Sequence, residues 1–452
     1  MRRTMKHNAT RVVYNDLSGG INVMSEGDLI APNEMQFCQN LWFLGYQRAL
    51  VPRGGLSSPV MELPAAIHGT FYDIDSNTLL VFLVDKSVCR IVGNMTKPLP
   101  LGKLTGGERP HCAKFKDCIW IASGGKLQVY DFSGSGGLQE VTEAPVCDMV
   151  FQRAARLCTC LSGSDRITLS AVGDAFTWAV DDNDKSKGAW LDVGYGDSGD
   201  IIAVVPLATD LLLIKNNGMI YQLVGDQAID TWAVYRVATE TDVIGHNCAA
   251  AVGNDAVFIS RQGMKTMQTT MDYGNIAQSD IAEKWNALVT RGLYEPEMFH
   301  LRRRKLLLIR PTARKEHLIA YNYAVGAATT LSFPVPVVSV VERPDGILVL
   351  SDRILYRLEE QNLTDDGTPI EYKLRPRDIV SGDEIIVRSV DSSMAAEQAG
   401  EALVEVDAMR LSMPVNARRK VRTNHTSARI VTTVSSQTPF QIKHLALEVA
   451  DL

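Results

Sequence analysis

The pattern of apolar and polar residues along this chain is that of short β-strands joined by tight turns. From about residue 79, an apolar strand, a polar turn and a second strand recur seven times, and helical periodicity is nearly absent outside Asn275–Val289. The first strands of these hairpins begin at Leu79, Cys118, Leu157, Leu211, Ala256, Leu306 and Ile347. A spacing of roughly 40–50 residues is typical of the four-stranded blades of a β-propeller. The sequence therefore predicts an all-β protein with a β-propeller of six or seven blades over residues 58–360.

The hairpins also indicate how the blades would stack. The first strand of each hairpin is the more apolar, which favours an inner position between neighbouring blades, because a blade cannot bury both of its faces alone. Turn residues such as Gly124-Gly125, Asn216–Gly218 and Gln262-Gly263 suit the chain reversals. A linear β-solenoid or tandem β-sandwiches would show a similar spacing. The number of blades stays open, because the N-terminal strand could complete the last blade.

The two ends of the chain depart from this rhythm. Residues 1–57 are predicted to form an arm of strands and turns. Within it, Asp16–Ser57 reads as two extended pieces joined by one helical turn, with a glycine turn at Gly19-Gly20 and a helix start near Pro32-Asn33. We expect this arm to contribute to ring closure. Near the other end, the long polar loop Ser392–Gly400 is followed by alternating strands. This pattern predicts a small C-terminal β-sandwich module over residues 361–452.

Composition is that of a globular protein with a hydrophobic core. The chain has 452 residues, of which 46% are hydrophobic, and a net charge of −6. This charge argues against a free DNA-binding protein that relies on counterion release, but suits a wall past which DNA slides. The start, MRRTMKHNAT, has no apolar core, and the longest apolar run, Ile201–Ala208, is too short to span a bilayer. We expect a soluble protein made in a cytosol, with its eight cysteines reduced.

The sequence contains no strong catalytic, metal or cofactor motif. The eight histidines show no metal-type pairing, and His111 beside Cys112 is better explained as a core histidine next to a buried thiol. The acidic run Asp181–Asp184 is better explained as a solvated loop than as a calcium site, because Lys185 occupies the position of the third ligand. Phosphate-loop, dinucleotide and Gly-x-Ser-x-Gly patterns are missing. We expect no cofactor, no bound metal and no catalytic residue.

Two basic clusters are candidate contacts with DNA in a channel or with a neighbouring subunit. Their members are Arg302, Arg303, Arg304 and Lys305, and Arg418, Arg419 and Lys420 followed by Arg422. Such runs on strand or loop edges are usually solvated and discourage edge-to-edge aggregation. The alternative is a ring of positive charge that meets DNA phosphates or an acidic neighbouring subunit. The clusters lack interleaved aromatic residues, which argues against base stacking of single strands.

Two stretches, residues 16–57 and 156–267, carry a resemblance to a known family. The residues involved are Gly19, Gly20, Asn22, Pro32, Asn33, Glu34, Asn40, Arg53 and Gly54 in the arm, and Trp178 and Tyr221 further on. On these residues the chain resembles β-propeller tail proteins of tailed bacteriophages, which include nozzle, hub and DNA-stabilisation proteins of short tails. Each matched residue has a structural role that suffices: glycines form turns, Trp178 fills the space between blades, and Tyr221 covers an apolar edge.

This resemblance implies a structural virion protein without enzymatic activity. The family's work is mechanical: a ring of identical subunits, expected to be a hexamer, continues the DNA channel below the portal and adaptor, retains the packaged genome and serves its ejection. The expected partners are further copies of the chain, portal, adaptor or neck proteins above, fibre, spike or needle proteins nearby, and double-stranded DNA in the lumen. We expect no small-molecule substrate and no membrane span, and a location in the virion tail.

Two other classes of function stay open. A propeller glycosidase or lyase would place two carboxylates across the scissile bond, and acidic residues open several hairpin strands, namely Asp117, Asp210, Asp255 and Asp345. Acidic residues at such positions more often form turns. A protein-binding propeller outside viruses is the third class, although the Gly-His and Trp-Asp signatures of the best-known version are missing.

Overall fold

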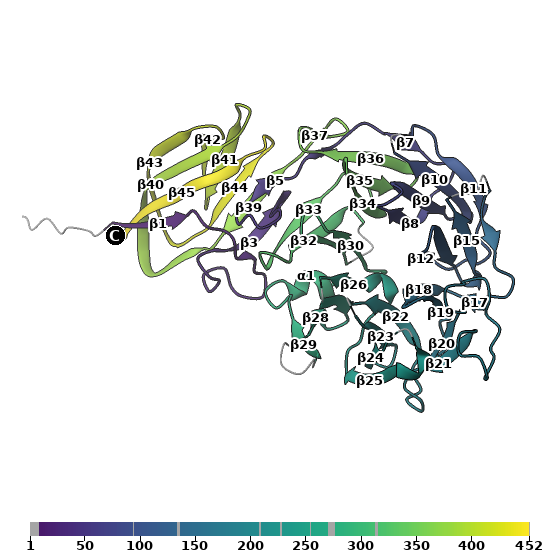
Figure 1. The fold of residues 1–452 in the computed structure, drawn as a ribbon. Helices are drawn as coiled ribbons and strands as arrows, with labels where there is room; N and C mark the ends of the chain where they lie inside the picture. Colours follow the sequence, from purple (N-terminus) through teal and green to yellow (C-terminus); the bar gives the residue numbers. More distant parts are fainter. Residues whose placement is uncertain are drawn as a thin grey trace, which may run out of the picture.

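The residues that the structure describes form seven four-stranded antiparallel units, here called blades, arranged around one axis (Figure 1). The structure is a computed structural model and describes residues 9–451 except 94, 133–135, 208, 227, 254, 270–275 and 312–314. Blades one to three consist of β8 (Ile67–Asp73), β9 (Thr78–Leu83), β10 (Ser87–Val92) and β11 (Leu99–Lys103); β12 (His111–Phe115), β13 (Cys118–Ala122), β15 (Gln128–Asp131) and β16 (Gln139–Glu140); and β18 (Met149–Arg153), β19 (Arg156–Cys160), β20 (Arg166–Leu169) and β21 (Ala189–Asp192).

The remaining four blades follow in chain order. They consist of β22 (Ile201–Pro206), β23 (Leu211–Lys215), β24 (Ile220–Val224) and β25 (Ala233–Ala238); β26 (Ala249–Val252), β27 (Asp255–Ser260), β28 (Gly263–Thr269) and β29 (Ile276–Asp280); β30 (Glu297–Leu301), β31 (Leu306–Arg310), β32 (His317–Asn322) and β33 (Ala327–Ser332); and β34 (Ser339–Arg343), β35 (Gly346–Ser351), β36 (Ile354–Glu359) and β6 (Gly55–Leu56). The all-β propeller fold expected from the sequence is confirmed.

The first strand of each blade lies innermost, next to the axis. Contacts run from β12 to β18, β22, β26, β30 and β34 in turn, and from β34 back to β8. The expectation that the more apolar hairpin strands would be the inner ones is therefore wrong, since those strands, such as β9, are the second strands of their blades. A second strand is paired along both edges and covered on both faces, so β9 is wholly buried, whereas the inner strand β12 is partly exposed.

Apolar side chains fill the gaps between neighbouring blades. Phe82 of blade one packs in one cluster with Ile119 of blade two, and the same kind of contact recurs from blade to blade. Leu348 of blade seven belongs to one cluster with Val81 of blade one, so the core continues around the whole ring. The stability of the repeat thus comes from stacking of blades, because no single blade covers its own faces.

A strand from the N-terminal region closes the ring and resolves the number of blades as seven. β6 supplies the fourth strand of the last blade, with Gly55 and Leu56 opposite Glu359 and Leu358 of β36. β7 (Met61–Glu62) pairs with the same strand. Ring closure by the N-terminal region therefore uses these few residues near the end of the arm.

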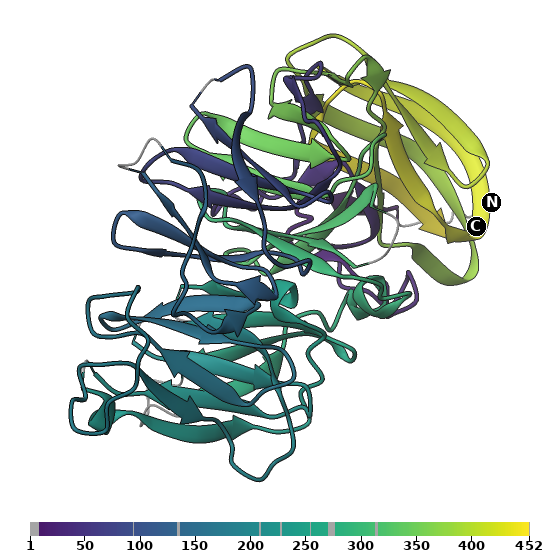
Figure 2. The same ribbon diagram turned by 90° about the vertical axis from the view of Figure 1, so that its right-hand side faces the viewer.

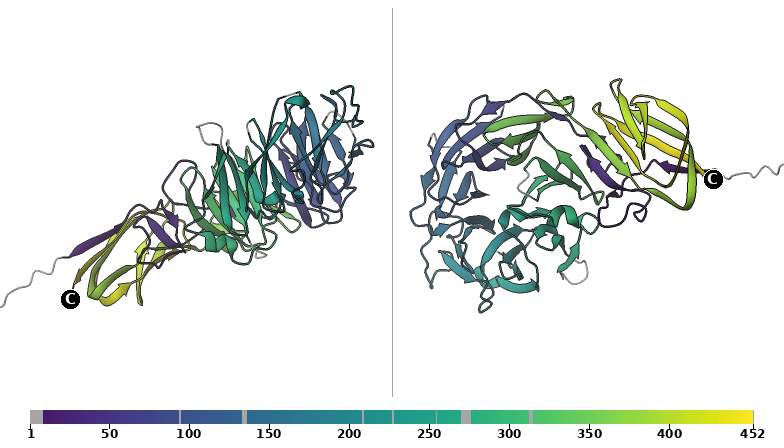
Figure 3. Two further views of the ribbon diagram at one scale, coloured as in Figure 1. Left: turned by 90° about the horizontal axis from the view of Figure 1, so that it is seen from below. Right: turned by 180° about the vertical axis from the view of Figure 1, so that it is seen from behind.

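The C-terminal residues form a two-sheet sandwich beside the propeller (Figure 3). Its strands are β1 (Thr10–Tyr14), β45 (Gln441–Asp451), β40 (Ile379–Ala395) and β43 (Arg418–Ile430) in one sheet, and β39 (Tyr372–Pro376), β44 (Thr432–Ser436), β41 (Glu401–Val406) and β42 (Met409–Pro414) in the other. The second sheet continues through β3 (Glu34–Gln39) into β33 of blade six, so both domains share one ten-stranded sheet.

The N-terminal arm is divided between the two domains. β1 pairs with β45 at the edge of the sandwich, which brings the first and last described strands side by side (Figure 2), whereas β3 joins the sandwich to blade six. The expectation that residues 1–57 as a whole serve ring closure is therefore too broad. Residues 1–8 lie outside the described residues.

Both helical expectations are corrected. The helix start expected near Pro32-Asn33 is the start of strand β3, because β39 and β33 provide pairing partners for this backbone. In the segment Asn275–Val289, Asn275 lies outside the described residues, Ile276–Asp280 is the outer strand β29, and only α1 (Asn286–Thr290) is helical.

Within the described residues, no helix has the length and apolar character needed to cross a membrane. The remaining short elements are β2 (Gly20–Ile21), β4 (Leu41–Trp42), β5 (Val51–Pro52), β14 (Gly125–Lys126), β17 (Val146–Cys147), β37 (Thr364–Asp365), β38 (Thr368–Pro369), η1 (Ile229–Thr231) and η2 (His246–Cys248).

Candidate functional site

Arg53 is the centre of a buried polar junction between the propeller and the sandwich. Its Nη1 and Nη2 donate to the two carboxylate oxygens of Asp365 at 2.8 and 2.5 Å, and both side chains are almost fully buried. Arg53 Nε donates to Asn40 Oδ1 at 2.9 Å, and Nη2 also donates to the carbonyl oxygen of Ser332 at 2.6 Å. The guanidinium carbon lies 4.3 Å from the centroid of the Phe333 ring. Only arginine provides this planar, bidentate and stacked arrangement.

The junction connects segments that are far apart in the sequence. Asn40 follows β3 in the left-handed conformation, with φ 62°, and its Nδ2 donates to the carbonyl oxygen of Glu371 at 2.8 Å. The N–H of Leu56, in the closing strand β6, donates to Asp365 Oδ1 at 2.9 Å. A Cβ at Gly54 would lie 2.1 Å from a carbonyl oxygen of β36, so this close approach requires glycine. One carboxylate therefore joins ring closure to the attachment of the sandwich.

Glu34 holds the first part of the arm in place. Its Oε2 accepts hydrogen bonds from Asn22 Nδ2 at 2.8 Å and from the N–H of Ala31 at 2.9 Å, and its Oε1 pairs with Lys284 Nζ at 2.7 Å. Burial raises the pKa of Glu34, but the hydrogen bonds from Lys284 and Asn22 outweigh it and lower the pKa below its ordinary value. The ionised carboxylate thus links the arm to the segment after blade five.

The turn residues of the arm surround Glu34. The N–H of Gly19 donates to the carbonyl oxygen of Asn33 at 2.9 Å, and a Cβ at Gly19 would lie 2.7 Å from Glu34 Cγ. Gly20 has φ 73°, a conformation that side chains with a Cβ rarely adopt. Pro32 is exposed in the turn that precedes β3. These residues position Glu34 and the entry into β3.

The arm residues that carry the family resemblance therefore lie in or beside two polar clusters, around Arg53 and around Glu34. Sequence reasoning missed the partners Asp365 and Lys284, which come from distant segments. Asp365 is followed by Asp366-Gly367, and this sequence reads as an ordinary turn. A buried arginine needs acceptors for its N–H groups, but the sequence does not indicate which groups supply them.

Trp178 and Tyr221 lie in the spaces between blades. Trp178 is buried between blades two and three, and its Nε1 donates to the carbonyl oxygen of Ala175 at 2.8 Å. Tyr221 belongs to the core between blades three and four, and its hydroxyl donates to Asp197 Oδ2 at 2.7 Å. Asp197 also pairs with the fully buried Lys215, whose Nζ lies 2.5 Å from Oδ1. Both aromatic residues thus pack and anchor neighbouring blades.

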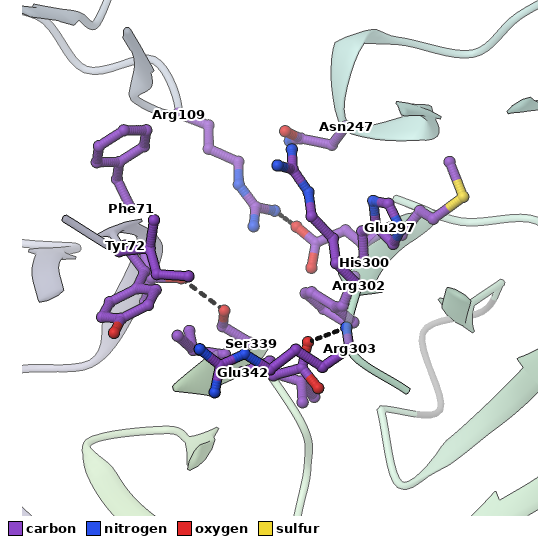
Figure 4. A pocket seen from close by; sticks show the side chains of 16 residues that line it. Phe71, Tyr72, Arg109, Asn247, Glu297, His300, Arg302, Arg303, Ser339 and Glu342 are labelled. Carbon is purple, nitrogen blue, oxygen red and sulfur yellow. Dashed lines mark hydrogen bonds and ion pairs between the residues drawn. The ribbon is translucent and has the colours of Figure 1, made fainter. Parts of the chain in front are cut away.

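A pocket of about 520 Å³ opens at the propeller axis (Figure 4). Its walls are the inner strands of blades six, seven and one, and Arg109 reaches it from a loop and Asn247 from η2. Arg109 points across the pocket and forms an ion pair with Glu297 of β30. Arg310 Nη2 pairs with the other oxygen of this carboxylate at 2.8 Å. Burial, followed by the charge of Arg310, lowers the pKa of Arg109 to about 10.

The first basic cluster forms the turn between β30 and β31 at the rim of this pocket. Arg302 and Arg303 are exposed pocket residues, whereas Arg304 Nη1 pairs with Glu342 Oε1 at 3.0 Å. Glu342 Oε2 accepts a hydrogen bond from the N–H of Arg303 at 2.8 Å. Lys305 Nζ lies 5.9 Å from the ring centroid of Tyr46 and 6.0 Å from that of Tyr323. The cluster thus divides into two exposed arginines, Arg302 and Arg303, and two residues that contact neighbouring side chains, Arg304 and Lys305.

The second basic cluster lies on the sandwich, at the start of its edge strand β43. Arg418 donates to both oxygens of the buried Asp391, at 3.0 and 2.7 Å, and Arg11 Nη2 also donates to Asp391 at 2.8 Å. Arg419 donates to a backbone carbonyl at 3.2 Å, and Lys420 Nζ pairs with a carboxylate of β45 at 3.1 Å. The two basic clusters belong to different domains, so no single ligand of small size contacts both.

We expect Asp391→Asn to make the stability of the protein less dependent on pH in the acidic range. The hydrogen bonds from Arg418 lower the pKa of Asp391, so its contribution to stability is present above the unfolded pKa and is lost as the pH falls through the lower folded pKa. The Tm of the wild type should exceed that of the variant at pH 7, and the gap should shrink as the pH falls towards about 3. Calorimetry between these pH values measures the difference in Tm between the two proteins. A constant gap would contradict the assignment.

The aspartates considered for a glycosidase do not line the axial pocket. Asp117, Asp210, Asp255 and Asp345 lie in or beside the turns between first and second strands. Asp210 accepts a hydrogen bond from Gln222 at 2.8 Å, and Asp345 pairs with Arg357 at 3.2 Å. The pocket carboxylates are Glu297 and Glu342, which the sequence did not single out.

The described residues contain no group of three metal-ligating side chains close enough to hold an ion. His111 accepts a hydrogen bond at Nδ1 from the N–H of Val150 at 3.3 Å, and burial lowers its pKa. The eight cysteines are free thiols, and burial raises the pKa of Cys112 and Cys158, which disfavours the reactive thiolate.

No family model and no curated protein matches the chain. Among solved structures, it is similar to YCF48 bound to a D1 peptide, with 10% identity, a TM-score of 0.43 and coverage of 66% of this chain and 93% of that one. The WD40 β-propeller domain of Doa1 has 12% identity and a TM-score of 0.45, covering 68% and 97%. The β-propeller domain of Cps50 (Swd1) from Myceliophteria thermophila has 11% identity and a TM-score of 0.44, covering 65% and 97%. The likeness concerns the fold alone: by its strand order this chain is a β-propeller.

Proposed function

We propose that this chain is a structural subunit of the tail of a tailed bacteriophage, in the nozzle or hub. The observation that carries this proposal is the buried junction of Arg53, Asn40 and Asp365, which fastens the sandwich to the propeller. A subunit that stands under load between neighbouring rings needs its two domains in one fixed orientation. The arm residues that resemble phage propeller tail proteins build this junction and the adjoining Glu34 cluster.

In this proposal, copies of the chain form a closed ring, expected to be a hexamer, that continues the DNA channel below the portal and adaptor. The ring retains the packaged genome and lets it pass during ejection. A closed ring of three or more subunits requires two different complementary surfaces on each subunit. The two basic clusters lie in separate domains. The mildly acidic net charge of the chain suits the wall of a DNA channel that does not bind DNA tightly.

The proposal includes no enzymatic activity. Hydrolysis of a glycosidic bond requires one carboxyl group that is protonated and acts as an acid. Glu297 is paired with Arg109 and Arg310, and Glu342 with Arg304. Nearby positive charge favours the ionised form of a carboxyl group, so neither is arranged as such an acid.

The test is the mass of the purified protein in solution, alone and mixed with the portal and adaptor proteins of the same phage. Light scattering should give a multiple of the 49.7 kDa chain, expected to be six, and negative-stain images should show rings with a central hole. Antibodies against the chain should label the tails of purified virions. A monomer at all concentrations that joins neither portal nor adaptor, and that is missing from virions, would overturn the proposal.

A further inference from the structure

We propose that the axial pocket binds a small oxyanion, a ligand that presents a carboxylate or phosphate group to one of the two exposed arginines at its rim, Arg302 or Arg303. The inference starts from the charges that line the pocket. Both of its carboxylates already have cationic partners, Glu297 in Arg109 and Arg310 and Glu342 in Arg304. Glu297 and Glu342 are both largely buried, and these arginines already balance their charges. Neither carboxylate is therefore available to balance further positive charge.

Arg302 and Arg303 have no carboxylate partner among the described residues. Both side chains are exposed at the pocket rim, and Figure 4 shows Arg302 extending towards Asn247 and Arg303 extending over Glu342. Burial, then the charges of Arg302 and Lys305, lowers the pKa of His300 to about 4, so this imidazole is neutral at pH 7. Arg302 and Arg303 thus add positive charge at the rim that no carboxylate of the described residues balances, and an anion would offset this charge.

The turn that carries the two arginines is held in place before any ligand arrives. The N–H of Arg303 donates to Glu342 at 2.8 Å, and the N–H of Gly45 donates to the carbonyl oxygen of Arg304 at 2.9 Å. Lys305 closes the turn in the left-handed conformation, with φ 58°. A turn positioned in this way reduces the entropy that ligand binding would otherwise cost.

The size and lining of the pocket decide which anions fit. About 520 Å³ is in the range of small-molecule sites. Guanidinium groups bind carboxylate and phosphate oxygens through paired N–H donors. The hydroxyls of Thr70 and Ser339, hydrogen-bonded to each other at 2.6 Å, and the amide of Asn247 add neutral polar groups to the walls.

Titration calorimetry with inorganic phosphate, citrate and hexaglutamate tests the site. We expect at least one of these probes to bind the wild type, and Arg302→Ala/Arg303→Ala to weaken that binding at least tenfold. The control Arg419→Ala/Arg422→Ala removes the same charge from the sandwich and should change the affinity less than twofold. Arg302→Lys/Arg303→Lys should retain part of the affinity, because it keeps the charge without the paired donors.

The three probes separate the sources of the anion. Preference for phosphate would assign a phosphorylated small molecule, preference for citrate a free carboxylic acid, and preference for hexaglutamate an acidic segment of a protein. Circular dichroism confirms that each variant is folded. The proposal is overturned if no probe binds the wild type, or if the alanine variant and the sandwich control bind equally. It does not depend on assembly into a tail, so its failure leaves the proposed function untouched.

Discussion

Asp365→Ala is expected to lower the free energy of unfolding by about 3–5 kcal/mol. The substitution leaves the guanidinium of Arg53 buried without its counter-charge, and it also removes the acceptor for the N–H of Leu56 in the closing strand. The cost combines an unpaired buried charge with an unsatisfied backbone donor. Urea unfolding followed by fluorescence measures it, provided that the transition is two-state.

The matched control is another bidentate arginine–aspartate pair, at an exposed position. Arg166 donates to Asp192 at 2.7 and 3.0 Å on the outer strands of blade three, and about half of the Arg166 side chain is exposed. We expect Asp192→Ala to cost less than about 1 kcal/mol. Equal costs for the two variants would contradict the view that the Arg53 junction holds the domains together.

Gly54→Ala is expected to lower the free energy of unfolding by about 1–3 kcal/mol. The added Cβ would lie 2.1 Å from the carbonyl oxygen of Glu359, and backbone atoms must move to admit it. This movement would separate β6 from β36 and displace the neighbouring Arg53. Urea unfolding measures the loss, and hydrogen exchange should show faster exchange in blade seven than in the wild type.

Gly382→Ala is the control for this substitution. Gly382 is exposed in β40 of the sandwich, and a Cβ there would have no atom within 4 Å. We expect a change within about 0.5 kcal/mol and unaltered exchange in blade seven. If the two alanine variants are equally stable, ring closure does not depend on the close approach at Gly54.

The hydrophobic pattern predicted the blades correctly but not the order of strands within them. Its strongest signal marks the second strand of each blade, because that strand is paired on both edges and covered on both faces. The inner strand β12 is partly exposed and less apolar, so the hydrophobic pattern did not identify it as a strand of the blade. The segment that includes β29 was misjudged as a helix for a related reason: pairing with β28 decides its conformation, and local periodicity does not report that pairing.

The candidate sites were predicted in part. The arm residues that carried the resemblance, Asn40 and Arg53 among them, do converge, but their partner Asp365 was not singled out from the sequence. The basic run beginning at Arg302 was recognised as a charge cluster, and its position at a pocket was not. Glu297 and Glu342, which define that pocket, lie in inner strands and have no sequence motif.

By itself, the sequence determined the all-β class, the repeat and the separate C-terminal module, since alternation, turn residues and spacing are properties of neighbouring residues. The tertiary structure decided the seventh blade's closure by β6, the sharing of one sheet by the two domains, and the partners of each buried charge. These features depend on contacts between residues hundreds of positions apart, such as Arg53 with Asp365. Local sequence preferences carry no information on which distant group will satisfy a buried donor, because many acceptors of equal chemistry compete for that place until the chain has folded.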